Sequence, residues 1–188
     1  MSIDSLLRLI PPPEDPAEAA LSGQWAPVEA QLGLTLPADY KAYIQRYGTG
    51  CFGDFLWPFN PISKNKNLNL FDQIRIRLKE AVEDAARVGA ASLYPPFNHY
   101  PQPGGLLPWG CTDNGDTLFW LTSLESGSWP IVIYECRAPE YDRFDGDMTE
   151  FIADVMFGRY HCPIFPENFS DVQTTFRSVT RQGQHENE

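Results

Sequence analysis

Residues 32–53 read LGLTLPADYKAYIQRYGTGCFG, and they decide the fold because they contain an amphipathic helix with its own start and stop signals. Pro37 suits the first position of a helix, and Gly48 suits the left-handed residue that follows the last turn. Between them, apolar side chains recur at spacings of three and four, which predicts one buried face. The residues of that face are Leu36, Tyr40, Tyr43, Ile44 and Tyr47. Three tyrosines on one face indicate a helix packed against a sheet, with hydroxyl groups that reach the rim of the sheet.

Short apolar runs after this helix predict strands. Residues 52–57 predict one strand, residues 129–135 another, and residues 141–144 a short edge strand. Because side chains alternate along a strand, Ile131 and Ile133 should face the same side of the sheet. Successive strands of this kind favour antiparallel pairing.

The clearest local prediction is a β-hairpin over residues 107–122, LPWGCTDNGDTLFWLT. Asn114 and Gly115 suit the two positive-φ positions of a two-residue type I′ turn. That turn would place Trp109 directly opposite Trp120, an aromatic pair that stabilises the two strands and fixes their register.

Two further helices are predicted. Residues 70–89 carry an apolar stripe of helical period opposite a charged face. Asp147 and Glu150 have the spacing of a capping box, and an apolar stripe follows them until Gly158 ends the helix. We therefore expect an α+β fold, a single domain in which a mainly antiparallel sheet of four to six strands packs against helices.

We divide the chain into three parts. Residues 1–16, with their run of prolines, form an N-terminal segment and linker, residues 17–172 form the domain, and residues 173–188 form a disordered tail without apolar periodicity. A chain of 188 residues that is 43% hydrophobic is long enough for one domain with a proper core.

Composition and charge exclude several classes of protein. The cysteines are far apart and no secretion signal precedes them, so we expect a reduced, cytoplasmic protein. No apolar run approaches the roughly 20 residues of a membrane span. The net charge of −11 argues against a nucleic-acid partner, because phosphate binding needs clustered Lys and Arg.

The negative charge is concentrated in the second half of the chain. Residues 113–171 contain twelve carboxylates against three arginines. This excess has two interpretations: it keeps the protein soluble, or it steers a basic protein partner to the surface.

Several of these motifs resemble a known family. The helix that ends near Glu29, the LG and LP pairs, the run DYKAYI and the turn YGTG resemble the signature of the SUKH superfamily, which is named partly after a yeast cell-wall synthesis regulator. The resemblance runs from about Trp25 to Gly158, and Gly115 and Asp116 match its central hairpin. It implies a binding module without catalytic residues. In bacteria the superfamily consists largely of immunity proteins, which protect a cell from polymorphic and contact-dependent toxins.

The residues themselves offer little chemistry. Asp113 and Asp116 could bind a cation or act as an acid–base pair, but Asp beside Asn-Gly is more often a turn residue. His99 and His161 lack other ligands at metal spacing, and Cys51 suits a buried position better than a nucleophile. We expect a protein that is not an enzyme, with no metal and no cofactor, and we place a hydrolase third among the possible functions.

The leading hypothesis is an immunity protein that binds and neutralises a toxin domain. The alternative is an intracellular scaffold that recognises a cellular protein or peptide through residues 94–105, an aromatic- and proline-rich segment that forms either an ordered loop or a mobile flap. The contact surface is predicted, from charge and loop position, at Trp57, Phe59, Phe97, Tyr100, Asp113, Asp116, Glu140, Asp142 and Asp145.

Overall fold

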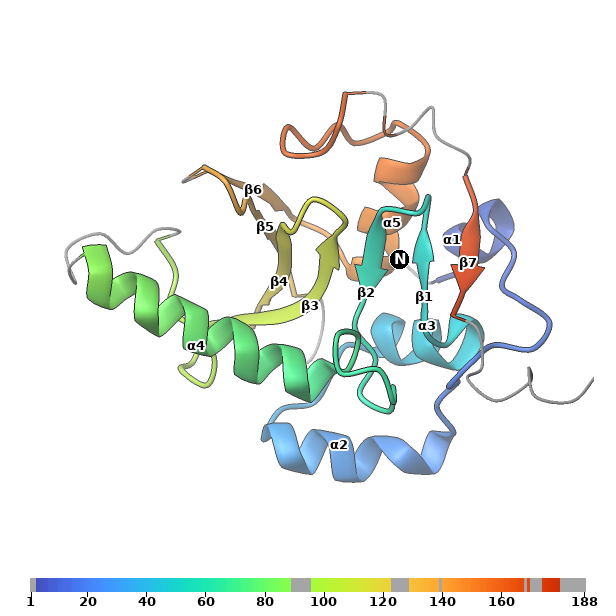
Figure 1. Ribbon diagram of the computed structural model, residues 1–188. Helices are drawn as coiled ribbons and strands as arrows, with labels where there is room; N and C mark the ends of the chain where they lie inside the picture. The colour runs from blue at the N-terminus through green and yellow to red at the C-terminus, as the bar shows by residue number, and fades with distance from the viewer. Residues whose placement is uncertain are drawn as a thin grey trace, which may run out of the picture.

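The computed structural model describes residues 3–88, 96–122, 129–138, 140–167, 169 and 174–179. It confirms a single α+β domain, in which a seven-stranded sheet is covered by helices (Figure 1). Every strand pairing in the sheet is antiparallel, in the order β6-β5-β4-β3-β2-β1-β7. Among the described helices, none combines the length and the apolar character that a membrane crossing needs.

The helices are α1 (Asp4–Leu9), the 3-10 turn η1 (Ser22–Gln24), α2 (Trp25–Leu32), α3 (Ala38–Tyr47), α4 (Leu70–Val88) and α5 (Met148–Met156). The strands are β1 (Gly50–Phe52), β2 (Leu56–Pro58), β3 (Leu106–Thr112), β4 (Thr117–Leu121), β5 (Ile131–Tyr134), β6 (Tyr141–Phe144) and β7 (Phe176–Ser178). Helix α4 crosses one face of the sheet at β3, while α3, α5 and α1 pack together on the other side (Figure 1).

Helix α3 has the predicted buried face. Its apolar stripe is fully enclosed, and Gly48 ends the helix at φ 67° and ψ −139°, a conformation that favours glycine but is not the predicted left-handed helical one. The predicted position of the tyrosine hydroxyls is wrong, because they lie in the interior. Tyr40 donates to the Phe59 carbonyl oxygen at 2.7 Å, and Tyr47 donates to the Ile10 carbonyl oxygen at 2.5 Å. Buried hydroxyls need such partners, since an apolar interior does not replace the hydrogen bonds of water.

The predicted register of the β3–β4 hairpin is wrong by one residue. The loop contains three residues, 113–115, and the Gly115 N–H donates to the Thr112 carbonyl oxygen at 3.0 Å while Gly115 itself takes the positive φ. A β-bulge between Pro108 and Gly110 adds a second residue to this shift, so Leu107, and not Trp109, pairs with Trp120. The two tryptophan rings, Trp109 and Trp120, still touch, with centroids 6.0 Å apart.

The sheet has seven strands, more than the predicted four to six, because β1 pairs both with β2 and with β7. Residues 52–57 are not one strand: Gly53 and Asp54 both adopt positive φ and turn the chain between β1 and β2. At the other end of the chain, β7 pairs with β1, with Cys51 opposite Arg177. The prediction of a disordered tail over 173–188 is therefore wrong for β7, and residues 173 and 180–188 lie outside the described residues.

The remaining predicted elements are confirmed. Ile131 and Ile133 of β5 face the main core, whereas Val132 belongs to a smaller cluster on the opposite face. Strand β6 is the edge strand, and Asp147 is the N-cap residue of α5, since its carboxylate accepts the Glu150 N–H at 2.8 Å.

The segment assigned to an N-terminal linker contributes to the same core. Leu6 and Ile10 are buried in the main cluster, and α1 packs against α5. Of the aromatic loop, residues 96–105 are described and residues 94 and 95 lie outside the described part. The loop is anchored at several points, among them the Tyr100 hydroxyl, which donates to the Leu32 carbonyl oxygen at 2.6 Å, so the structure favours the ordered loop over the flap.

Two tyrosines of α3 provide a test of this packing. The Tyr43 hydroxyl is buried without a hydrogen-bond partner among the described residues, whereas the Tyr47 hydroxyl has one. We expect Tyr43→Phe to leave the free energy of unfolding unchanged or higher, and Tyr47→Phe to lower it by about 1 kcal/mol or more. Urea denaturation of the two variants checks this; equal losses would contradict the assigned hydrogen bonds.

The Glu18 carboxylate predicts a pH dependence. Burial would raise the pKa of Glu18, but hydrogen bonds from the Lys64 N–H and from the Thr49 and Ser63 hydroxyls outweigh it and lower that pKa. A lowered pKa means that the unfolded chain binds the proton more readily, so the stabilisation is present above the ordinary value of about 4.3 and disappears as the pH falls through the folded-state pKa. Wild type should therefore be more stable than Glu18→Gln at pH 7, and the difference should shrink towards pH 3. A difference in unfolding free energy that does not depend on pH would contradict this.

Candidate partner-binding surface

Three of the predicted contact residues lie together at the β6 edge of the sheet. Glu140 precedes β6, Asp142 lies within it and Asp145 follows it. The β3–β4 turn lies against the same end, since the Cys136 Sγ is 3.2 Å from the Asn114 carbonyl oxygen, and Asp113 is exposed in that turn. We call this surface the acidic end: Asp113, Glu135, Glu140, Asp142 and Asp145.

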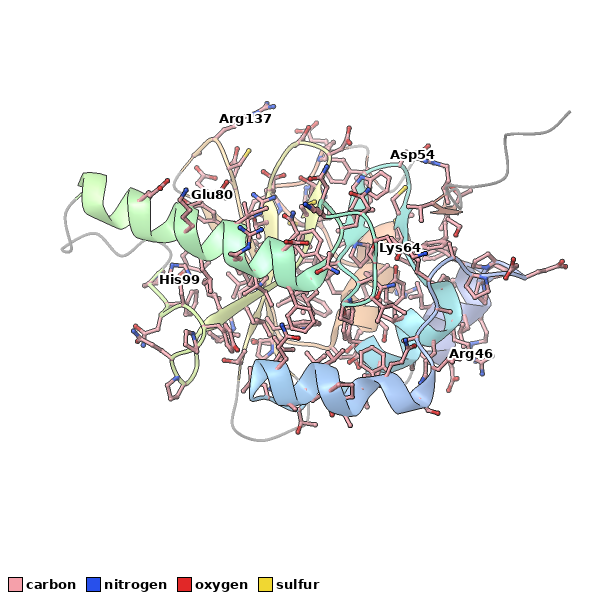
Figure 2. All side chains as sticks on the ribbon, turned by 60° about the horizontal axis from the view of Figure 1, so that its bottom comes forward. Arg46, Asp54, Lys64, Glu80, His99 and Arg137 are labelled. Atoms are coloured by element: carbon pink, nitrogen blue, oxygen red, sulfur yellow. The ribbon has the colours of Figure 1, made fainter. Side chains whose placement is uncertain are left out.

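Little of the negative charge at the acidic end is neutralised. Arg143 forms an exposed ion pair with Asp145 at 2.7 Å, a kind of contact that contributes little to stability. Arg137 projects into solvent beyond β5 (Figure 2). Asp113, Glu135 and Glu140 have no ion-pair partner in the part of the chain that the structure describes. The acidic end therefore presents an electrostatic surface that suits a basic partner.

An aromatic pair lies beside these carboxylates. The Phe97 ring packs edge-to-face on Tyr141 of β6, with centroids 5.6 Å apart. Tyr141 is 37% exposed, which is unusual for a large ring in this molecule. The sequence pattern placed Tyr141 in an edge strand but did not identify it as a contact residue; its signal was an aromatic side chain on the face of β6 away from the main core.

Two predicted contact residues cannot contribute to a surface, because they are buried. Phe59 is 0% exposed and its carbonyl oxygen accepts the Tyr40 hydroxyl. Asp116 is 3% exposed, and its carboxylate accepts the Thr112 hydroxyl at 2.7 Å and the Cys136 N–H at 3.2 Å. The Asp116 carboxylate holds the β3–β4 turn against the residues that follow β5, so its role is structural.

Trp57 and Tyr100 lie in different contacts from the acidic end. Trp57 of β2 packs beneath the Arg177 guanidinium, 5.5 Å from its ring centroid, and Arg177 in turn donates to Asp54 at 2.6 Å. Tyr100 is partly buried against α2 through its hydroxyl. The structure thus brings Phe97, Asp113, Glu140, Asp142 and Asp145 to one end of the sheet and leaves the other predicted residues out.

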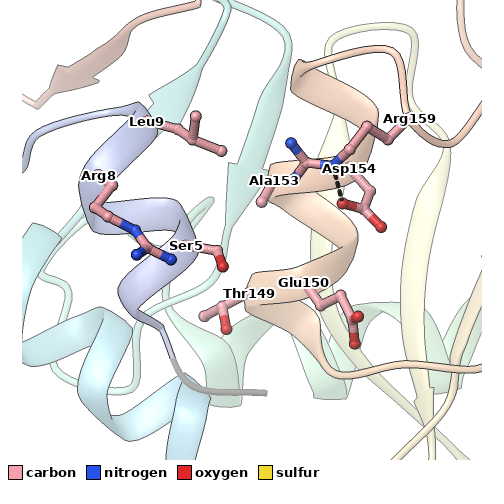
Figure 3. A pocket seen from close by; sticks show the side chains of 8 residues that line it. All are labelled: Ser5, Arg8, Leu9, Thr149, Glu150, Ala153, Asp154 and Arg159. Atoms are coloured by element: carbon pink, nitrogen blue, oxygen red, sulfur yellow. Dashed lines mark hydrogen bonds and ion pairs between the residues drawn. The ribbon is translucent and has the colours of Figure 1, made fainter.

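A cleft of about 540 Å³ opens between α1 and α5 (Figure 3). Leu9 and Ala153 form part of its wall, and the Arg8 side chain lies on the α1 side, with its head group towards Ser5 (Figure 3) and without an ion-pair partner among the described residues. On the α5 side, Arg159 is already bound to Asp154 at 2.7 Å. The mixed charges of this cleft favour no particular ligand.

The titratable groups show no activated nucleophile among the described residues. Burial raises the pKa of the Cys51 and Cys111 thiols to about 11 and that of Cys162 to about 12, which disfavours a thiolate. Burial also raises the pKa of the exposed Cys136, and the neighbouring Asp116 charge adds to this effect. Within the described residues, no three His, Cys, Asp or Glu side chains gather closely enough to hold a metal ion.

Comparison with known proteins identifies the family. The model of the SUKH_6 family, described as SMI1-KNR4 cell-wall, matches residues 22–154. The chain is a SUKH protein. No curated protein and no solved structure gives a significant match. In this SUKH protein the matched range runs from η1 into α5, so α1, β7 and the residues after α5 lie outside it.

The two aspartates of the hairpin provide a matched test of their different roles. Asp116→Asn should lower the free energy of unfolding by about 1–3 kcal/mol, because a buried, hydrogen-bonded carboxylate is lost. Asp113→Asn, at an exposed position of the same turn, should change it by less than about 0.5 kcal/mol. Thermal or urea unfolding measures both, and similar effects at the two positions would contradict the structural role of Asp116.

Proposed function

We propose that this SUKH protein is a non-catalytic immunity protein, which binds a basic toxin domain and neutralises it. The observation that supports this most is the acidic end, where carboxylates lie beside the exposed Tyr141 ring and the half-buried Phe97 ring. Aromatic side chains with a charged rim are typical of protein interfaces. Family membership agrees with a binding function, because the SUKH superfamily in bacteria consists largely of immunity proteins.

The proposed contact has two components. The carboxylates of the acidic end raise the rate of encounter with a basic partner, since complementary potentials act at long range. Tyr141 and Phe97 then provide the apolar area, and the Tyr141 ring offers its face to a Lys or Arg side chain of the toxin. Asp142 differs from the other carboxylates of the acidic end because its two oxygens accept the Arg143 N–H and the Tyr160 hydroxyl.

The test begins with capture of the partner. The protein is immobilised, a low-salt lysate of the source organism is passed over it, and a salt gradient elutes what binds. We expect one basic protein with a toxin-like domain, which stops growth when expressed alone in a test cell and is harmless when this SUKH protein is co-expressed. Several weakly bound proteins without toxicity would contradict the immunity function and favour the scaffold alternative.

Charge reversal then tests the surface. The triple variant Asp113→Lys, Glu140→Lys and Asp145→Lys should slow association with the captured protein by about tenfold or more and flatten its dependence on salt. The control reverses three exposed carboxylates elsewhere, Glu14→Lys, Glu83→Lys and Glu167→Lys, which changes the net charge equally. Stopped-flow association rates that are equal in the two triple variants would remove the acidic end from the proposal.

A further inference from the structure

Strand β6 forms one edge of the sheet, and its backbone groups alternate in direction. The Glu135 N–H donates to the Glu140 carbonyl oxygen at 3.0 Å, so the residues that pair with β5 through hydrogen bonds are Glu140, Asp142 and Phe144. The N–H and carbonyl of Arg143 consequently point away from β5. Such outward-facing groups on an edge strand are a template for pairing with another chain.

Side chains cover these groups. The Asp142 Oδ1 accepts the Arg143 N–H at 2.9 Å, and the Asp142 Oδ2 accepts the Tyr160 hydroxyl at 2.5 Å. The Tyr160 oxygen also lies 3.4 Å from the Arg143 carbonyl oxygen. One carboxylate and one phenol therefore occupy the space in which an added strand would pair at Arg143.

Tyr160 is held firmly in this position. Its ring packs edge-to-face against Phe144 at 4.9 Å and lies 6.1 Å from Phe151 of α5. Burial raises the pKa of Tyr160, and the hydrogen bond to Asp142 adds to the effect, so the hydroxyl stays protonated and able to donate. Tyr160 lies beyond the range that the family model matches, so this contact belongs to this chain's own extension after α5.

We propose that Tyr160 and Asp142 form a latch on β6, which prevents the edge strand from pairing with β6 of a second copy. With the latch closed the chain is a monomer. With the latch open, Arg143 exchanges backbone hydrogen bonds with an antiparallel β6 of the second copy. Self-association of this kind does not depend on the immunity function.

The side chains of β6 favour pairing with β6 of a second copy over pairing with an unrelated strand. On the face away from the main core, β6 carries Tyr141 and Arg143, which are two residues apart. An antiparallel two-fold pairing can place Tyr141 opposite Arg143 of the second copy, and the same contact then occurs twice. The net charge of −11 opposes this pairing, so self-association through β6 should strengthen as salt screens the repulsion. Binding of a basic partner should instead weaken as the salt concentration rises, so the two kinds of association can be told apart.

The test opens the latch by removing its two polar groups. The double variant Asp142→Ala with Tyr160→Phe keeps the ring that packs on Phe144 but removes the donor and the acceptor. We expect its dimerisation constant, measured by sedimentation velocity at micromolar concentration and high salt, to be at least about tenfold stronger than that of wild type. The control, Glu14→Ala with Tyr100→Phe, removes a carboxylate and a phenol hydroxyl elsewhere and should dimerise as weakly as wild type. An opened variant with a native circular-dichroism spectrum that stays as monomeric as wild type would overturn the proposal.

A further substitution tests whether dimers of the opened variant form through β6. Arg143→Pro in the opened background removes the outward-facing N–H, which an edge strand tolerates but an added strand does not. It should restore the monomer, whereas Arg143→Ala, which loses the contact with Tyr141 but keeps the N–H, should weaken the dimer much less. Dimers of the opened variant that persist after Arg143→Pro would mean that another surface is responsible and would overturn the latch.

If the double variant unfolds, hydrogen exchange of the wild-type backbone amides tests the latch instead. The latch predicts that the Arg143 N–H exchanges slowly, because the Asp142 carboxylate accepts it. Exchange of the Arg143 N–H as fast as that of an exposed amide would contradict the latch.

Discussion

The buried aromatic face of α3 is the constraint on which the rest of the structure depends. Tyr40 packs edge-to-face on Trp120 of β4 at 4.9 Å and donates its hydroxyl to the carbonyl of Phe59. Tyr47 contacts Phe52 of β1 and fixes the N-terminal segment through the carbonyl of Ile10. One face of α3 therefore fixes the positions of β4, β1 and the N-terminal segment. It does so through hydrogen bonds as well as apolar contacts.

This constraint explains why the candidate surface lies where it does. The main core uses the inner face of the sheet, and α4 crosses the outer face at β3, so the β6 edge is left at the periphery. Exposed carboxylates gather there, and the small outer cluster around Val132 supports Phe97, which in turn packs on Tyr141. The sheet thus carries an exposed Tyr141 ring, supported by the half-buried Phe97, within an acidic surface.

Part of the fold could be predicted from the sequence, because helix faces, helix caps and strand alternation depend on residues a few positions apart. The α3 face, the capped start of α5 and the alternation in β5 follow from spacing and from capping residues, which act over a few positions. The hairpin register did not follow, because the Asn-Gly pair supports a two-residue turn as readily as a three-residue one with Gly115 in last place. Strand β7 and the burial of Asp116 depend on contacts between distant segments, and no local pattern encodes them. For the candidate surface, the charge pattern predicted that Glu140, Asp142 and Asp145 lie together, because they are neighbours in sequence. It did not predict that the Asp142 carboxylate accepts the Tyr160 hydroxyl and the Arg143 N–H, because Tyr160 is distant in sequence.

Whether the β6 edge binds the partner is decided most sharply by a hydrogen-exchange footprint of the full chain, with and without the captured toxin domain. We expect slower exchange in residues 134–145, in the β3–β4 turn and around Phe97, with no change along the α1–α5 cleft. Protection confined to that cleft or to α2, with the β6 edge exchanging as in the free protein, would contradict the proposed surface.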